Sequence, residues 1–220
     1  MADTTPPRNV IYVNNATYPL TDIVNLPYTD VIIGFLVPDD NLNLYGSGGA
    51  FDDNLQANIS ALQNAGKNVL ISVGGSGGWP SSAYESYYQD VPGFVDQIVN
   101  NFVKQYGFNG VDIDYEDDNG FTGTYNGIDF LSKLTNDLAQ ALPPGQNIIT
   151  HAPQTPYWDP NYNNAPYAQL WQRVGNQITW INNQFYNQPG YVETSADFVN
   201  WYQKIAAHYR TTKTIGGRDT

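Results

Sequence analysis

The feature that most constrains the fold of this chain is an alternation of short apolar runs with longer amphipathic stretches along its 220 residues. The apolar runs are rich in β-branched and aromatic residues, as expected of strands that are covered on both faces. They predict six strands, at Asn9 to Val13, Asp30 to Leu36, Asn68 to Val73, Gly110 to Tyr115, Asn147 to His151 and Thr179 to Tyr186.

The stretches between these runs predict helices. Their apolar residues recur every three or four positions, at Asp53 to Ala65, Phe94 to Tyr106, Ile128 to Leu142 and Ser195 to Tyr209. Strands that alternate with helices indicate right-handed βαβ units and a parallel sheet. A doubly wound open sheet and a (β/α)₈ barrel both satisfy this order, and no Gly-x-Gly-x-x-Gly turn follows the first strand to indicate a dinucleotide site. No linker or repeat divides the chain, so residues 1–220 are expected to form one domain.

Composition excludes several classes of function. The formal net charge of -12 disfavours nucleic acid and anionic membranes as partners, and no apolar run approaches the length of a membrane span. The chain has no cysteine, which excludes thiolate catalysis and disulfides. Its 17 tyrosines and 5 tryptophans, beside many Asn and Gln residues, suit sugar faces and hydroxyls.

The first residues contain neither a basic region nor an apolar core of the kind that a signal peptide needs. We therefore expect either a cytoplasmic protein or the mature form of a secreted one whose leader is absent.

The segment Gly110-Val111-Asp112-Ile113-Asp114-Tyr115-Glu116 contains the residues most suited to catalysis. Side chains alternate between the faces of a strand, so Asp112, Asp114 and Glu116 share one face and the apolar residues between them share the other. Three carboxylates on one face repel one another, which raises at least one pKa and favours a carboxylic acid that is still protonated near neutral pH. A general acid needs this property.

Two other interpretations of this segment are weaker. An exposed strand with a wet acidic face is typical of antiparallel sheets, whereas the flanking βαβ pattern predicts a buried parallel strand. A calcium loop of the EF-hand type that starts at Asp112 needs Gly at its sixth position and Glu at its twelfth, where this chain has Asp117 and Gly123. We expect no metal site and no cofactor.

The acidic segment resembles the signature of glycoside hydrolase family 18, Asp-Gly-x-Asp-x-Asp-x-Glu, with Asn109 in place of the first Asp. Ser72-Val73-Gly74-Gly75 is similar to the end of the third strand of that family. Gln184-Phe185-Tyr186-Asn187 and Ala152-Pro153-Gln154 are most similar to the sixth strand and to the end of the fifth strand in hevamine-type chitinases. The resemblance extends from about residue 9 to 216 and implies a TIM-type (β/α) barrel.

The resemblance also implies a mechanism, namely retention by substrate assistance. Glu116 is expected to protonate the glycosidic oxygen, and the 2-acetamido oxygen of the substrate is expected to act as the nucleophile. Asp114 is expected to bind the acetamide N–H and to share a proton with Asp112, while Tyr186 donates its hydroxyl to the acetamide carbonyl.

Several further residues are candidates for sugar binding. The resemblance suggests Gln184 and Asn187 as sugar contacts. Trp158 and Trp79 follow predicted strands and are candidate stacking platforms, although core packing is the usual role of Trp. Gly75 lies in a glycine-rich turn that either lets a sugar approach the backbone or only forms a tight turn. His151 ends a predicted strand, where a structural hydrogen bond is the expected role.

The barrel is expected to be incomplete at its C-terminal end. Only a weak seventh strand, Lys213 to Gly217, follows the sixth, and no eighth strand is visible. An open barrel exposes two strand edges, which favours self-association.

Three functions stay open. The first is endo-acting hydrolysis of β-1,4-linked N-acetylglucosamine in chitin, and the second is endo-β-N-acetylglucosaminidase activity on the chitobiose core of N-glycans. The third is a non-catalytic chitin- or glycan-binding lectin on the same scaffold. Glu116 favours an enzyme, because lectins of the family typically lack this residue.

Overall fold

The strands form one curled, mostly parallel sheet in the computed structural model, which describes residues 7–14, 19–77 and 79–215. Its strands run in the order β1-β2-β4-β5-β6-β7, and a short strand β3 pairs antiparallel with β2. The bounds are β1 Val10–Val13, β2 Asp30–Pro38, β3 Leu44–Gly46, β4 Asn68–Gly74, β5 Gly110–Asp114, β6 Ile148–His151 and β7 Trp180–Ile181.

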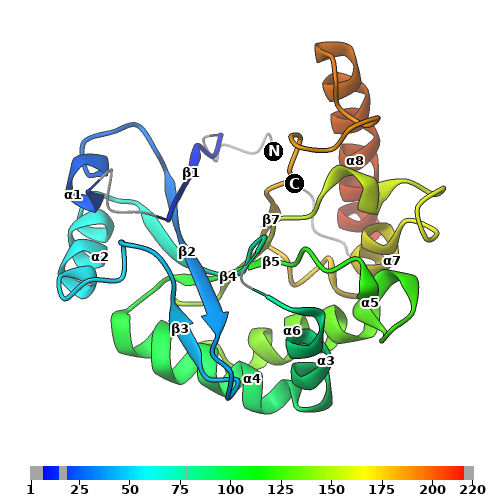
Figure 1. Ribbon diagram of the computed structural model, residues 1–220. Coiled ribbons are helices and arrows are strands. Elements are labelled where there is room, and N and C mark those ends of the chain that lie inside the picture. Colours follow the sequence, from blue (N-terminus) through cyan, green and yellow to red (C-terminus); the bar gives the residue numbers. More distant parts are fainter. Residues whose placement is uncertain (1–6, 15–18, 78, 216–220) are drawn as a thin grey trace.

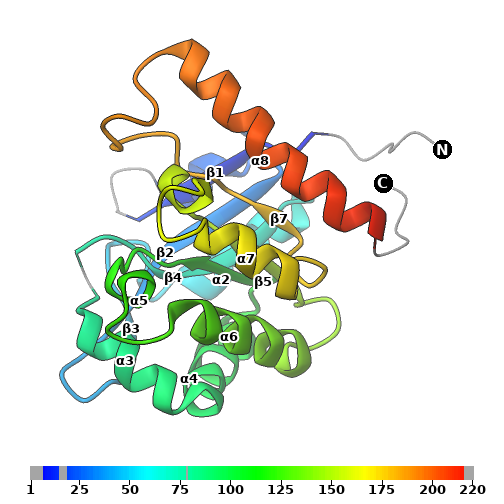
Figure 2. The same ribbon diagram turned by 90° about the vertical axis from the view of Figure 1, so that its right-hand side faces the viewer.

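Helices surround the outer side of this sheet, which makes the molecule an incomplete TIM-type barrel with β1 and β7 at the two ends (Figure 1). In the side view α7 lies between α6 and α8 (Figure 2). The helices are α1 Leu20–Ile23, α2 Leu55–Asn64, α3 Ser81–Gln89, α4 Val91–Ile98, α5 Asn119–Thr122, α6 Gly127–Ala141, α7 Pro166–Val174 and α8 Ser195–Ile215. A π-helical stretch, Val99–Lys104, extends α4, and a 3₁₀ turn covers Thr155–Trp158.

The prediction of an incomplete barrel is confirmed, but two predicted strands differ from the structure. The sixth, Thr179 to Tyr186, is regular only over Trp180–Ile181 and is followed by a single bridge between Gln154 and Gln184. The side chains of Asn182 and Asn183 hydrogen-bond locally there, and such bonds compete with a regular strand ladder.

The predicted seventh strand, Lys213 to Gly217, is wrong over residues 213–215. These residues continue α8, and residues 216 and 217 lie outside the described part of the chain. Their β-branched side chains suggest a strand. A helix that has already formed gains one hydrogen bond for each residue that it adds, which outweighs a weak local preference.

The two faces of the sheet have different roles. The outward side chains of Val111 and Ile113 in β5, and of Tyr115 directly after it, belong to the main apolar core between the sheet and the helices. On the inner face a smaller apolar cluster of Ile32, Leu70 and Trp180, with Val10 and Ile148 beside it, forms the floor of the barrel. The polar residues of β5 therefore lie above an apolar floor, because they occupy the next inward positions along the strand.

The two ends of the sheet approach each other at this floor. The guanidinium of Arg8 lies 3.8 Å from the centre of the Trp180 ring of β7. Arg8 also forms an ion pair of 2.9 Å with Asp30, a fully buried carboxylate of β2. One cation thus links both ends of the incomplete barrel from the inside, although β1 and β7 share no ladder of hydrogen bonds.

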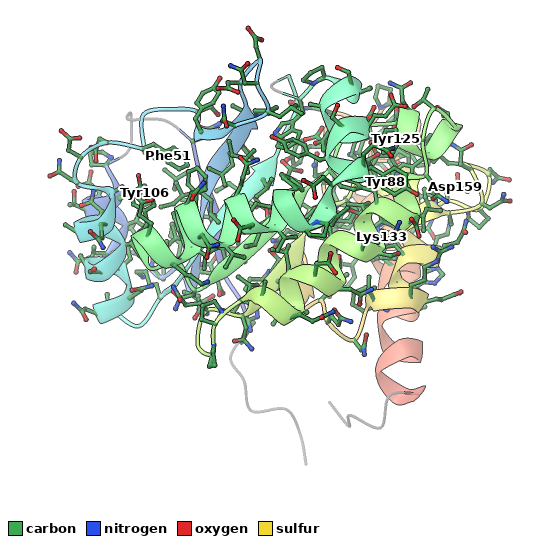
Figure 3. The ribbon with its side chains drawn as sticks, turned by 90° about the horizontal axis from the view of Figure 1, so that it is seen from below. Phe51, Tyr88, Tyr106, Tyr125, Lys133 and Asp159 are labelled. Carbon is green, nitrogen blue, oxygen red and sulfur yellow. The ribbon has the colours of Figure 1, made fainter. Side chains whose placement is uncertain are left out.

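Contacts between helices stabilise the outside of the barrel. The view from below shows three side chains close together (Figure 3). They are Tyr88 of α3, Lys133 of α6, and Tyr125, which lies just before α6. The Tyr88 hydroxyl donates to Asp129, and the Lys133 ammonium lies 4.9 Å from the centre of the Tyr88 ring. Among the described residues, none of the helices combines the length and the apolar character that crossing a membrane requires.

The structure explains why Asn109 can replace the first Asp of the acidic signature. Its side-chain oxygen accepts a hydrogen bond from the backbone N–H of Val69 at 2.9 Å and another from the amide of Gln63 at 2.9 Å. This contact joins the start of β4 to the start of β5. It needs an acceptor oxygen at residue 109 but no negative charge.

We predict that Asn109→Leu lowers the free energy of unfolding by about 1–3 kcal/mol, because the Val69 N–H is left without its acceptor. Asn109→Asp keeps the acceptor and is expected to change the free energy by less than about 1 kcal/mol. Urea denaturation of both variants tests the assignment. Equal stability of Asn109→Leu and the unmodified protein would contradict it.

Candidate active site

Asp112 lies at the centre of the inner face. The register of the sheet aligns it with Ser72 of β4 and Thr150 of β6. Its Oδ2 accepts hydrogen bonds from the hydroxyls of Ser72 at 2.8 Å and Tyr12 at 3.0 Å. Its Oδ1 accepts from the Thr150 hydroxyl at 2.5 Å and from the Asn182 amide at 3.3 Å. Four donors therefore surround a carboxylate that is fully buried.

Asp114 lies two residues further along β5 and is also buried. Its Oδ1 accepts a hydrogen bond of 2.9 Å from the side-chain amide of Gln184. Its backbone carbonyl accepts from the N–H of Gly75, 2.8 Å away. At Gly74 an added Cβ would lie 2.0 Å from that same carbonyl oxygen, so only glycine fits beside Asp114 there.

The pKa values of both Asp112 and Asp114 are raised, which favours a proton on one of the two carboxyl groups. Burial raises the pKa of Asp112, and its hydrogen-bond donors oppose that shift. Burial, followed by the negative charges of Asp112 and Glu116, raises the pKa of Asp114 well above its usual range. Because Asp112 already accepts four hydrogen bonds, Asp114 is the better carrier of one proton held by the pair.

Glu116 lies just beyond the end of β5 and is half-buried. Its Oε2 accepts a hydrogen bond of 2.9 Å from the amide of Gln154, and its Oε1 lies 3.4 Å from the amide nitrogen of Gln184. Gln184 thus contacts both Asp114 and Glu116. The three carboxyl groups form a series of increasing exposure from the barrel floor to the open end of the strands.

A cleft of about 430 Å³ opens beside Asp114, the member of this series that lines it. Tyr186, which is 61 % exposed, lies at this cleft together with Asp114 and Gln184. The remaining lining comes from both ends of the sheet, from β2 and from the residue that follows β6, with Val10, Tyr12, Asn14, Phe35, Ala152, Asn182 and Asn183. Polar amides, tyrosine hydroxyls and one apolar ring are suited to a polar ligand that also has an apolar face.

The other candidate residues of the sequence lie elsewhere. Trp158 is 3 % exposed, and its indole N–H donates to Asn183, so its ring packs in the core and offers no free face for a sugar. Trp79 stacks on Tyr84 with ring centres 4.6 Å apart and donates to the carbonyl of Leu36. Neither tryptophan lines the cleft. Core packing decided both positions, because large rings bury the most apolar area.

Gly75 and Asn187 adjoin the site without lining the cleft. Gly75 has a φ of +89°, and a Cβ there would lie 3.1 Å from the ring of Phe35, so the residue makes the tight turn that ends β4. Asn187 is exposed and has a φ of +56°, which fits a turn directly after Tyr186.

The structure also brings in residues that the sequence analysis did not select: Tyr12, Thr150, Asn182, Phe35 and Gln154. All but Phe35 could have been found as polar residues at the inward positions of largely apolar strands. Phe35 could not. The pairing of β2 shifts between Ile33 and Leu36, so strict alternation assigns Phe35 to the wrong face.

His151 has the structural role that the sequence predicts. The Thr135 hydroxyl donates to the carbonyl of Leu131, so it accepts from His151 Nε2, 3.1 Å away. The Tyr167 hydroxyl lies 3.3 Å from Nδ1, where it can donate. The imidazole is therefore neutral with its proton on Nε2.

Among residues 7–14, 19–77 and 79–215, no group of three or more acidic or histidine side chains is arranged to hold a metal ion. The groups that this site offers for chemistry are the carboxyl groups of Glu116 and Asp114, which can transfer protons, beside the hydroxyl of Tyr186 and the amide of Gln184.

Known proteins of one family are similar to this chain in sequence and in fold. A family model described as glycosyl hydrolases family 18 matches residues 8–217. The crystal structure of a GH18 chitinase from Pseudoalteromonas aurantia superposes with a TM-score of 0.81 at 37 % identity, over 89 % of this chain and 75 % of that one. A fungal endo-β-N-acetylglucosaminidase of the same family shares the fold, with a TM-score of 0.64 at 20 % identity over 92 % of this chain and 73 % of that one.

The curated relatives that match are named chitinases and are longer than this chain. Chitinase 1 of Tulipa saxatilis subsp. bakeri is 25 % identical over 151 residues, which are 68 % of this chain and 41 % of that protein. The chain spans less than half the length of the curated relatives that it matches.

We predict that His151 destabilises the fold in acid. Burial lowers its pKa from 6.5 to about 3. Below pH 6.5 the unfolded chain binds a proton that the folded chain refuses, so stability is lost as the pH falls from 6.5 toward 3. The loss is about 1.4 kcal/mol per pH unit, or about 3 kcal/mol at pH 4.5.

The raised pKa values of Asp112 and Asp114 act in the opposite sense, so the measurement is the difference between the unmodified protein and His151→Gln. Urea denaturation at pH 6.5 and pH 4.5 gives this difference. We expect the unmodified protein to lose more stability than the variant over this interval. Parallel losses would mean that His151 takes up a proton in the folded state.

Proposed function

Because the chain belongs to the glycosyl hydrolases of family 18, we propose that it is an endo-acting hydrolase of β-1,4-linked N-acetylglucosamine in chitin and chito-oligosaccharides. The observation that carries this proposal is the series Asp112, Asp114 and Glu116 on one face of β5, with Gln184 and Tyr186 beside it at a cleft. A relative whose solved structure is described as a GH18 chitinase, at 37 % identity, supports chitin as the substrate.

In this mechanism Glu116 protonates the glycosidic oxygen as general acid, and the C1–O bond breaks as the 2-acetamido oxygen of the substrate attacks C1. The leaving sugar departs with the proton from Glu116. A water molecule then attacks C1 from the side that the leaving sugar vacated, and Glu116 takes its proton. The bond between C1 and the acetamido oxygen breaks in this step, which restores the acetamido group. Both steps invert C1, so the product retains the β configuration.

Asp114 and Tyr186 position the nucleophile. The Asp114 carboxyl receives the acetamide N–H and stabilises the positive charge that develops on the cyclic intermediate. The Tyr186 hydroxyl donates to the acetamide oxygen and aligns it with C1. Asp112 shares one proton with Asp114, and its four hydrogen-bond donors favour the ionised form of Asp112, so that the proton resides on Asp114 when the site is empty.

We expect the protein to cleave chitin hexasaccharide, to release β-anomers first, and to leave the fully de-N-acetylated hexasaccharide intact, because the nucleophile is the acetamido oxygen. Mass spectrometry of the products and ¹H NMR of freshly formed anomers measure this. Cleavage of a high-mannose glycopeptide alone would indicate an endo-β-N-acetylglucosaminidase. Binding of both glycans without cleavage would indicate a lectin.

Glu116→Gln removes the proton but keeps the size and shape of the side chain. We expect it to lower kcat on chitin hexasaccharide by about 10²- to 10⁴-fold while the Kd for the oligosaccharide changes little. Glu85→Gln, on the exposed face of α3, is the matched control and should retain full activity. A Glu116→Gln variant with an unchanged rate would rule out Glu116 as the proton donor.

A further inference from the structure

Gln154 is a residue for which the mechanism above has no task. It follows β6 at the open end of the sheet and is half-buried. Its side-chain amide nitrogen lies 2.9 Å from Oε2 of Glu116, which is a hydrogen bond of ordinary length. An amide N–H is a donor, so the Oε2 atom in this contact acts as an acceptor.

The other oxygen of Glu116 has a weaker partner. The amide nitrogen of Gln184 has two hydrogens but three acceptors in range. Asp114 Oδ1 lies at 2.9 Å and the carbonyl oxygen of Ala152 at 3.0 Å, whereas Glu116 Oε1 lies at 3.4 Å. The two shorter contacts use both hydrogens. Oε1 is therefore the oxygen of Glu116 that has no committed donor.

We infer that Gln154 is a positioning residue for the proton donor: its amide holds Glu116 Oε2 as an acceptor, so that the transferable proton resides on Oε1. This inference rests on the proposed role of Glu116 as general acid. A carboxylic acid whose rotation is fixed and whose protonated oxygen is defined presents the proton to the substrate in one orientation, which is what efficient proton transfer requires.

The backbone around Gln154 fixes the position of its amide. Gln154 and Gln184 form a parallel bridge that extends the pairing of β6 with β7. The N–H of Gln184 donates to the carbonyl of Pro153 at 2.8 Å, and the Thr155 hydroxyl donates to the carbonyl of Gln184 at 2.8 Å. Both glutamines thus lie at one level of the barrel and contact the same carboxylate from the segments that follow β6 and β7.

Within the described residues, no cation takes the place of Gln154 beside Glu116. In the described part of the chain, the side-chain ion pairs join Arg8 to Asp30 and Lys133 to Asp129, so none involves Glu116. The titratable groups that act on the same region are Asp114, Tyr186 and Tyr84, each of which is neutral or negative. An uncharged N–H donor orients Glu116 without adding a positive charge that would hold it ionised.

Gln154→Met keeps the length of the side chain and removes the donor. We expect kcat/KM for chitin hexasaccharide to fall by about tenfold to a hundredfold, with the larger part of the loss in kcat rather than in KM. For 4-methylumbelliferyl β-chitotrioside we expect a fall of less than about threefold, because its leaving group departs with little help from an acid. Equal losses on both substrates would overturn the inference and leave Gln154 a purely structural role.

The control is Gln146→Met. Gln146 is also half-buried, and its amide donates to the carbonyls of Val103 and Phe108 at 3.0 and 2.9 Å, but it precedes β6 at the opposite end of the sheet. This variant loses a comparable amide donor and is expected to lower both rates equally or not at all. A selective loss on the hexasaccharide in Gln146→Met as well would contradict a specific role for Gln154.

A second measurement does not depend on hydrolysis. The chain has three glutamates, Glu85, Glu116 and Glu193, so selective ¹³C labelling of the glutamate carboxyl carbons gives a spectrum that Glu116→Gln assigns. At one pH, the Glu116 resonance should move in Gln154→Met and stay in place in Gln146→Met. An unmoved resonance in Gln154→Met refutes the contact, whereas a moved resonance in a protein that cleaves no glycan refutes the proposed function alone.

Discussion

The buried carboxylate of Asp112 is the interaction on which the rest of the inner face depends. An unpaired carboxylate in a fully buried position is strongly unfavourable, and here hydrogen bonds rather than a cation compensate for it. The four donors come from β1, β4, β6 and the residue that follows β7. Satisfying one carboxylate therefore draws together strands from the middle and from both ends of an incomplete barrel. The Arg8 contact with Trp180 reinforces this closure one level below.

Asp114 and Glu116, the next residues on this face, are more exposed than Asp112 and have fewer fixed partners. Asp114 keeps one side-chain donor, and Glu116, just beyond β5, accepts from Gln154 at the rim. Below it, Gly110 leaves room for the backbone of β6, since a Cβ at residue 110 would lie 1.9 Å from the carbonyl oxygen of Ile148. Within residues 110–116 the inward positions therefore pass from a closely packed glycine to carboxyl groups that can transfer protons. Every second side chain lies at a different level of the barrel.

The aromatic residues serve the scaffold more than the ligand. Trp79, Tyr84, Tyr87 and Phe94 pack against one another beneath α3 and α4, and a second group around Tyr157 and Tyr167 packs under α7. Tyrosine hydroxyls in these groups also hold the loop after Glu116: Tyr125 donates to Asp117, and Tyr157 and Tyr162 donate to Asp118. Many of the tyrosines that made the composition suited to sugars therefore stabilise the acidic segment and the helices outside the sheet. Among the described residues, Tyr186 and Tyr12 are the tyrosines that line the cleft.

The sequence by itself determined the parallel βαβ order, the face that Asp112, Asp114 and Glu116 share, and the similarity to family 18. Periodicity and a short motif are local properties, and local properties can be read from a chain. Only the tertiary structure decided which side chains meet those carboxylates. Tyr12 lies 100 residues from Asp112 and Gln154 lies 38 from Glu116, and their contacts depend on sheet register and barrel curvature. Packing likewise decided that Trp158 is buried and that Phe35 points inward. Continuity with the preceding helix decided that residues 213–215 are helical. Neither cause is present in a local sequence pattern.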